Sequence, residues 1–228
     1  PPLITLGIPL FWGGMNWQQL TTGLTPELLL LTLRTLGLAL AATLLAGLAA
    51  LLLAIAKRWS RARWLRGVTF LAGMGYAIPG AVLALALLVI GAPWQLSPIL
   101  LLLWGYSDRF LAVNKGGIDA ALERLSPSLD EAATGLGLRW PAVLKRVHLP
   151  LLRGPILVGS LLVFVDTVKE LPLTFALRPF DFDTLAVRVF QYAGDERLAA
   201  AVWPALMILV LGLVASSALV PRLDRDTE

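Results

Sequence analysis

Hydrophobic residues in this chain fall in long, nearly uninterrupted blocks, whereas a soluble domain would show them at helical or alternating spacing. About 20 apolar residues in a helix are needed to cross the ~30 Å hydrocarbon layer of a bilayer. Five blocks reach or approach that length: residues 35–56, 67–92, 95–113, 155–176 and 198–220. An earlier run, residues 3–12, is too short, and we expect it to belong to a helix that starts before this sequence. The pattern therefore predicts an all-α membrane protein, a polytopic helical bundle with five complete spans and part of a sixth.

Helix-breaking residues interrupt this pattern at two places. Pro26 and Glu27 precede the first span and mark where its helix begins. The second block contains Pro79, which is flanked by Gly75 and Gly80. Such breakers are tolerated in membrane helices where neighbouring helices satisfy the freed backbone groups. We therefore expect the second block to cross the membrane as one span.

Basic residues indicate the orientation of the bundle. The link between the first two spans carries five basic residues and no acidic one: Lys57, Arg58, Arg61, Arg63 and Arg66. The next link, residues 91–94, has no charge. Cytoplasmic loops of membrane proteins collect Lys and Arg, so the first link is predicted to be cytoplasmic. Alternation then places residues 114–154 and the tail at 222–228 in the cytoplasm, and residues 177–197 outside.

Composition supports a membrane protein and excludes several other classes. The chain is 57% hydrophobic and 15% charged, whereas about a quarter of the residues in a soluble domain are charged. It has no cysteine, which excludes disulfides, Fe–S clusters and thiolate metal sites. The net charge of +4 fits cytoplasmic loops better than a nucleic-acid partner, because no basic stripe interleaves with aromatic residues. No HExxH, GxSxG or Walker Gly-Lys sequence is present, so we expect no enzymatic activity in this chain.

The long predicted cytoplasmic loop, residues 114–154, carries helix signals of its own. Ser128 and Glu131 have the spacing of a capping box, and Gly135 and Gly137 can end the short helix that follows. A second short helix is predicted to have Pro141 in its first turn and to end before the next span. The residues that end it are Leu149 and Pro150, and its apolar face is formed by Val143, Leu144 and Val147.

A helical hairpin of this kind can act in two ways. A short helix with an apolar face, held at the membrane surface, fits a groove on a soluble partner. It also fits the lipid interface, with its apolar face turned toward the acyl chains. The residue pattern alone leaves both interpretations open.

The loop also resembles the EAA motif of ABC importer permeases, the binding-protein-dependent, MetI-like superfamily. That motif is Glu-Ala-Ala, three residues, Gly, nine residues, an aliphatic residue, any residue and Leu-Pro. The matching residues are Glu131, Ala132, Ala133, Gly137, Val147, Leu149 and Pro150. Val147 stands where Ile is commoner and keeps the β-branched shape. The resemblance implies a MetI-like transmembrane domain at residues 28–221, in which the loop docks on a separate ATPase as a coupling helix.

The same resemblance implies the partners of the chain. An ABC ATPase dimer would bind ATP and Mg²⁺, so this chain would hold no cofactor itself. A periplasmic solute-binding protein would deliver the solute, and a second permease half or copy would complete the pathway in the bacterial inner membrane. A secondary transporter is the alternative function, because coupling ions often bind at broken helices and Pro79 can break the second span.

Longer segments are similar to one branch of this superfamily, the ferric iron permeases. They are residues 109–125, 150–172 and 177–193. Those permeases commonly fuse two halves, and this sequence resembles a C-terminal half whose first helix is truncated, residues 1–27. Related permeases for thiamine, phosphonate, sulfate or polyamines share parts of these segments. The outer loop has five oxygen-bearing side chains without the spacing of a coordination loop: Asp181, Asp183, Tyr192, Asp195 and Glu196. We therefore assign capture of the solute to the binding protein, on the family resemblance.

Charged residues inside the predicted spans are candidates for the translocation path, because such residues are costly in lipid and tend to face a bundle interior. Asp166, Lys169 and Glu170 share one face if the fourth span is a continuous helix, and they would then line the outer part of the path. The simpler alternative, which we favour, is a local Asp166–Lys169 pair. Asp108 and Arg109 are predicted to lie at the membrane interface, where Arg can snorkel.

The only histidine is not expected to bind a metal. His148 lies at a variable position of the EAA pattern, and one histidine alone cannot hold a metal ion.

Overall fold

The computed structural model describes residues 25–60 and 62–224, and every regular element in these residues is a helix. The long helices are α3 (Pro26–Trp59), α6 (Pro98–Arg124), α9 (Leu149–Val168) and α12 (Leu198–Asp224). The shorter ones are α4 (Arg63–Ala72), α5 (Gly80–Gly91), α7 (Pro127–Gly135), α8 (Trp140–Val143), α10 (Pro172–Leu177) and α11 (Leu185–Gly194). Brief 3₁₀ turns at Gly75–Ala77 and Ala92–Trp94 and a π-helical turn at Leu144–His148 complete the set. The predicted partial helix at residues 3–12 and Arg61 of the basic link lie outside the described residues.

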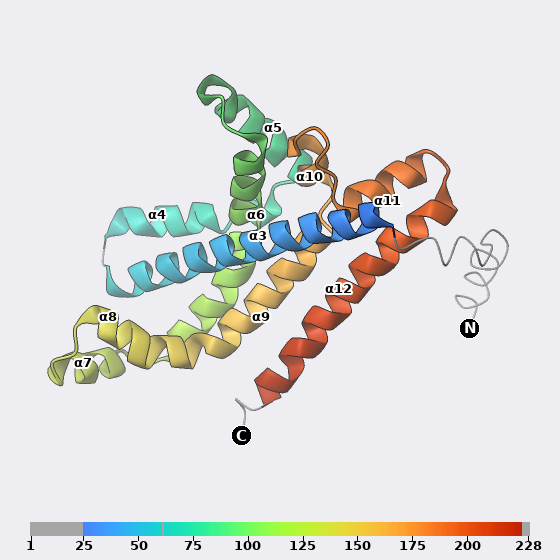
Figure 1. Cartoon of the computed structure of the whole chain (residues 1–228). Coiled ribbons are helices and arrows are strands. Elements are labelled where there is room, and N and C mark those ends of the chain that lie inside the picture. Colours follow the sequence, from blue (N-terminus) through green and yellow to red (C-terminus); the bar gives the residue numbers. More distant parts are fainter. Residues whose placement is uncertain (1–24, 61, 225–228) are drawn as a thin grey trace.

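Helices α3, α6 and α9 form the centre of the bundle (Figure 1). Helix α3 begins as predicted, with Pro26 in its first turn and the Thr25 side chain accepting a hydrogen bond from the Leu28 amide. One face of α3 is a fully buried stripe of small residues: Ala39, Ala42, Ala46 and Ala50. Small side chains let membrane helices approach closely. The neighbouring helices add Leu102, Tyr106 and Phe110 of α6 and Val163 of α9 to this core.

The first and fifth predicted spans are confirmed as continuous helices. Three helical stretches are long and apolar enough to cross a membrane, namely Pro26–Trp59, Trp140–Val168 and Leu198–Ser217. On α3 the face away from the core is also apolar, and its leucines are exposed: Leu33, Leu40, Leu44, Leu48 and Leu52. A helix that is hydrophobic all round is typical of a membrane span, where lipid covers the outer face.

The second predicted span is wrong as a continuous helix. Helix α4 starts at Arg63 and ends at Ala72, and α5 starts only at Gly80, after Pro79. The intervening turn lies so close to α6 that a Cβ atom on Gly75 would collide with the backbone carbonyl of Asp108. The chain therefore breaks here, and α5 alone is a short apolar helix.

The third and fourth predicted spans end at different residues from those expected. Helix α6 runs through residues 114–124, so part of the predicted loop is helical and Asp108 and Arg109 lie inside the helix. The fourth helix is continuous from Trp140 and ends at Val168 rather than at residue 176. Pro172 starts the separate helix α10, since proline is favoured in a first helical turn and cannot continue an interior one.

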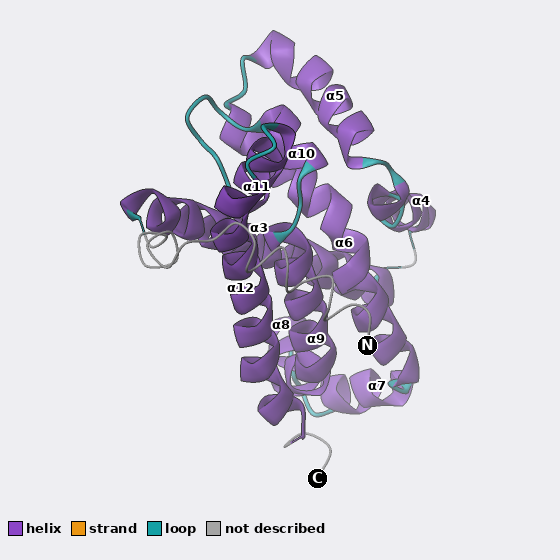
Figure 2. Ribbon diagram, turned by 90° about the vertical axis from the view of Figure 1, so that its right-hand side faces the viewer, coloured by secondary structure: helices purple, strands orange, loops and turns teal. Residues whose placement is uncertain are grey.

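The two ends of the bundle carry different elements (Figures 1 and 2). Helices α7 and α8 lie at one end, and α5 and α10 lie toward the other. The predicted outer loop, residues 177–197, contains α11, whose first amide, on Leu185, donates a hydrogen bond to Thr35 at 3.0 Å. An ion pair of 2.5 Å between Arg188 and Glu27 also fixes α11 beside the start of α3.

Candidate functional site: the helical hairpin and the charged helix breaks

Helix α7 begins differently from the prediction. Its N-cap is Ser126, whose hydroxyl accepts a hydrogen bond from the Ser128 amide at 3.3 Å, and Pro127 occupies the first helical position. The predicted capping box of Ser128 and Glu131 is therefore wrong. The reason is that proline favours the first position of a helix, which moves the cap to Ser126. Glu131 then lies more than one turn inside α7 and is exposed.

The residues that match the EAA pattern present one buried and several exposed side chains. Ala133 is buried against the rest of the chain, while Glu131 and Ala132 face solvent. Gly137 has a φ of +79°, which only glycine adopts readily. Its amide bonds to the Thr134 carbonyl and the Leu138 amide bonds to the Ala133 carbonyl, at 2.9 and 3.1 Å. These two bonds form a Schellman motif, so Gly137 ends the helix as predicted.

The second helix of the hairpin does not end at Leu149 and Pro150. Pro141 lies in the first turn of α8 as predicted, but the helix continues through a π-helical turn into α9. In that turn the Leu149 amide bonds to the Leu144 carbonyl, one residue further back than in an α-helix. We attribute the continuity to this wider turn, which relieves the clash that the Pro150 ring would make with a regular α-helical backbone.

The predicted apolar face of the second helix points into this chain. Val143 is buried, and Leu144 and Val147 are half-buried. Exposed apolar side chains come instead from Leu136 and Trp140, which are 84% and 64% exposed. Sequence reasoning missed both residues. The sequence signal that could have identified them is their position on either side of the turn at Gly137.

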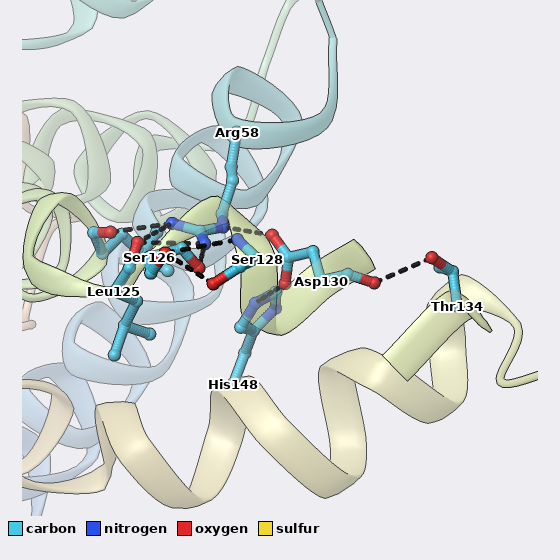
Figure 3. A network of polar contacts seen from close by, with 8 residues as sticks. Arg58, Leu125, Ser126, Ser128, Asp130, Thr134 and His148 are labelled. Carbon is cyan, nitrogen blue, oxygen red and sulfur yellow. Dashed lines mark hydrogen bonds and ion pairs between the residues drawn. The ribbon is translucent and has the colours of Figure 1, made fainter. Parts of the chain in front are cut away.

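A partly buried polar network joins α7 to the bundle (Figure 3). The Arg58 guanidinium donates to Asp130 Oδ2 at 2.7 Å and to the Leu122 carbonyl at 2.7 Å. It also reaches the Leu125 carbonyl at 3.2 Å. His148 Nε2 lies 2.7 Å from Asp130 Oδ1. Neither contact was predicted, because each joins residues that are far apart in the chain: Arg58 was expected only to mark the cytoplasmic side, and His148 was given no role.

The candidate path residues of the fourth span do not share one face. Lys169 pairs with Asp166 at 2.9 Å, which is the local pair that we favoured. Glu170 follows the end of α9 instead of continuing it, and its Oε1 accepts a hydrogen bond from the Leu173 amide at 3.2 Å. The four-residue spacing from Asp166 to Glu170 therefore does not place these two carboxylates on one helix face.

Arg109 joins two helix breaks, one before α5 and one after α9. Its Nη1 donates to the Ile78 carbonyl at 2.6 Å, in the break before α5, and its Nε lies 4.0 Å from Glu170 Oε2. The Tyr76 ring lies 5.9 Å from the Arg109 Cζ. These contacts turn the Arg109 side chain toward neighbouring segments of the chain, whereas the prediction had it snorkel to the interface.

The acidic side chains of the outer loop are only partly available to bind a cation. Asp183 forms ion pairs with Arg178 and with Arg188. Among the residues that the structure describes, no group of three or more His, Asp or Glu side chains is arranged to hold a metal ion.

Solved structures of ABC importers share this fold. The MetNI methionine ABC transporter in an inward-facing conformation matches with a TM-score of 0.70 and 17% identity, over 89% of this chain and 99% of that chain. A bacterial alginate ABC transporter, in complex with an alginate pentasaccharide-bound periplasmic protein, matches with a TM-score of 0.71 and 15% identity. The match covers 97% of this chain and 89% of that chain. At these identities the likeness is one of fold.

Sequence comparison adds a relative and a family. The Fe(3+)-transport system permease protein FbpB 2 of Haemophilus influenzae is 27% identical over 138 residues, which is 59% of this chain. The matched region is 27% of that relative's own length. Residues 46–228 match the family described as binding-protein-dependent transport system inner membrane component. This range contains the whole hairpin, the polar network and both helix breaks. The chain therefore belongs to the binding-protein-dependent transport system inner membrane component family, the MetI-like permeases.

Proposed function

We propose that this chain is the membrane-spanning permease subunit of an ATP-driven ABC importer in the bacterial inner membrane. The observation that carries the proposal is the EAA-like spacing on the hairpin of α7 and α8. In the structure this hairpin projects from one end of the bundle (Figures 1 and 2). Membership of a family of inner membrane transport components supports the same function.

The hairpin offers a surface suited to a soluble ATPase. Glu131 and Ala132 are exposed on α7, and Leu136 and Trp140 expose large apolar surfaces at the adjoining turn. Exposed apolar side chains beside a charged group are typical of an interaction site rather than a solvated loop. ATP and Mg²⁺ would be bound by the ATPase, and movement of its two copies would switch the permease between inward- and outward-facing states.

Ferric iron is the solute that we propose. The support is the 27% identical Fe(3+) permease relative and the resemblance of three segments to ferric iron permeases. A periplasmic binding protein would deliver the iron to the face that carries α11, and a second permease half or copy would complete the pathway. Thiamine, phosphonate, sulfate or a polyamine is the alternative solute, because related permeases share these segments.

The outer gate of the pathway is assigned to the helix breaks around Glu170. Intramembrane charges that face the bundle interior mark transport paths in many membrane proteins. Glu170 is 11% exposed and faces Arg109, whereas Lys169 is 62% exposed and pairs with Asp166. Of the three charged residues of this segment, Glu170 is therefore the better candidate for a gating role.

Substitution in the hairpin tests the coupling role. We expect Glu131→Ala and Gly137→Val to leave the chain in the membrane but to release the ATPase from the purified complex. The first removes an exposed charge from α7, and the second forces a β-branched residue into a left-handed backbone conformation. Asp195→Ala, an exposed acid at the end of α11, is the matched control and should retain the ATPase.

Retention of the ATPase by both hairpin variants would count against the coupling assignment. Uptake by the chain alone in ATPase-free proteoliposomes would instead favour a secondary transporter. The solute is tested separately, by measuring which binding protein stimulates ATP hydrolysis in the reconstituted complex. Stimulation by a ferric-loaded protein is the expected result, and stimulation only by a thiamine- or sulfate-binding protein would replace iron.

A further inference from the structure

Apolar packing holds α7 only weakly to the bundle. Ala133 is the one buried residue that α7 contributes. Beside it lies an open cavity of about 530 Å³ between α3, α7 and α8, lined mainly by apolar side chains such as Leu52, Ile55 and Trp59. A helix that buries so little surface can shift without disturbing its neighbours. Movement of α7 therefore needs another connection if it is to reach the membrane spans.

The Asp130 carboxylate supplies a connection to α3 and α6. Arg58 is the second-last residue of α3, and its guanidinium bonds to Asp130 and to the carbonyls of Leu122 and Leu125, where α6 ends. A guanidinium at these carbonyls also complements the negative end of the α6 dipole. Arg58 and Asp130 are 13% and 19% exposed, so salt screens this pair less than a surface pair.

The same carboxylate is connected to α9. His148 lies at the end of the π-helical turn that leads directly into α9, and its side chain is 1% exposed. Its Nε2 contacts the second Asp130 oxygen at 2.7 Å, and the Trp59 ring lies 5.3 Å from the imidazole. Asp130 thus bonds with one oxygen to the end of α3 and with the other to the start of α9 (Figure 3).

We propose that Arg58, Asp130 and His148 form a polar latch that transmits movement of α7 to α3 and α9. This inference rests on the proposed function, because it takes α7 as the helix on which the ATPase acts. Charge-assisted hydrogen bonds are short, directional and stronger than neutral ones, so they can carry displacement of α7 in addition to the backbone turn at residues 136–139. The three residues are positioning residues that act between the docking surface and the spans.

The Asp130→Ala substitution tests the latch without changing the docking surface. We expect Asp130→Ala to keep the ATPase bound, because the exposed Glu131, Leu136 and Trp140 surface is unchanged. ATP hydrolysis should persist, while the amount of solute moved per ATP should fall by about tenfold or more. Asp130→Asn keeps the shape and part of the hydrogen bonding, so it should restore part of the coupling. Thr134→Ala is the matched control, since the Thr134 hydroxyl bonds only to carbonyls of its own helix and uptake per ATP should not change.

A distance measurement tests the mechanical link directly. The chain has no cysteine, and a Cβ at Gly135 of α7 or Gly154 of α9 would meet no neighbouring atom within 4 Å. Spin labels on cysteines at these two positions should show one narrow distance distribution in both nucleotide-free and nucleotide-trapped complexes. In Asp130→Ala the distribution should broaden, because α7 would move without α9.

The failure of the latch and the failure of the proposed function give different results. Wild-type uptake per ATP in Asp130→Ala with the ATPase bound, or an unchanged label distribution, overturns the latch alone. If the wild-type chain never retains an ATPase, the proposed function falls and the latch falls with it. Where Asp130→Ala does not assemble, His148→Leu severs only the α9 side and should give the same uncoupling; normal coupling in that variant also overturns the latch.

Discussion

Arg109 connects three parts of the chain that are far apart in sequence. It extends from the middle of α6 to the Ile78 carbonyl in one helix break and to the Glu170 carboxylate in the other. Arg109→Leu would leave Glu170, which is 11% exposed, without its cation. Leaving a largely buried polar group without its partner costs about 1–3 kcal/mol, so we expect a lower unfolding temperature in detergent.

A double-variant cycle separates the ion pair from packing. Glu170→Gln keeps an acceptor for the Leu173 amide, so its loss of stability should be smaller than that of Arg109→Leu. Combining Arg109→Leu with Glu170→Gln should cost less than the sum of the two single changes. If the two single substitutions lower the unfolding temperature by amounts that add up to the change in the double variant, these side chains do not interact.

Sequence reasoning could identify the charged residues but not their partners. The pair of Asp166 and Lys169 was predictable because both lie on one helix, three residues apart. The contacts of Arg109 and Glu170 depend on where two helices break, and those breaks depend in turn on contacts with α6. The Asp130–His148 contact likewise requires the hairpin to fold back on itself, which no local pattern encodes.

The break between α4 and α5 depends on the close approach of Gly75 to α6. A Cβ atom at Gly75 would collide with the Asp108 carbonyl, and a backbone group cannot rotate away as a side chain does. We expect Gly75→Ala to destabilise the protein by about 1–3 kcal/mol and to reduce uptake. Gly67→Ala in α4 is the matched control, because a Cβ there meets no atom within 4 Å and alanine favours helix. Equal unfolding temperatures for the two variants would show that the approach at Gly75 is not tight.

The helices that were predicted correctly are those whose ends are set locally. Helix α3 has a cap at Thr25 and a proline in its first turn, and α12 is a long uninterrupted apolar run. The hairpin was located correctly from its glycines and Pro141, but its ends were not. Pro150 was expected to stop a helix, and the π-helical turn before it allows the helix to continue. Such a turn has no sequence signature comparable to a cap.

The whole molecule is consistent with a single orientation in the membrane. Charge placed the basic link after α3 in the cytoplasm, and alternation of the spans placed the hairpin on the same side. The structure brings Arg58 of that link to within 2.7 Å of Asp130 in the hairpin. Helix α9 then carries the chain from the hairpin to α10 and α11 at the opposite end of the bundle (Figures 1 and 2). Charge bias and tertiary contacts thus agree, although they are independent observations.

Labelling of single cysteines in intact cells tests this orientation. Gly135 lies at the end of α7 and Gly194 at the end of α11, and a Cβ at either position meets no atom within 4 Å. We expect a membrane-impermeant maleimide to react with Gly194→Cys from the periplasm once the outer membrane is permeabilised. Gly135→Cys should react only after the inner membrane is opened, because a cytoplasmic ATPase could not otherwise reach α7. Reaction of Gly135→Cys from the periplasmic side would place the hairpin beyond any cytoplasmic partner, and both the coupling role and the latch would then be untenable.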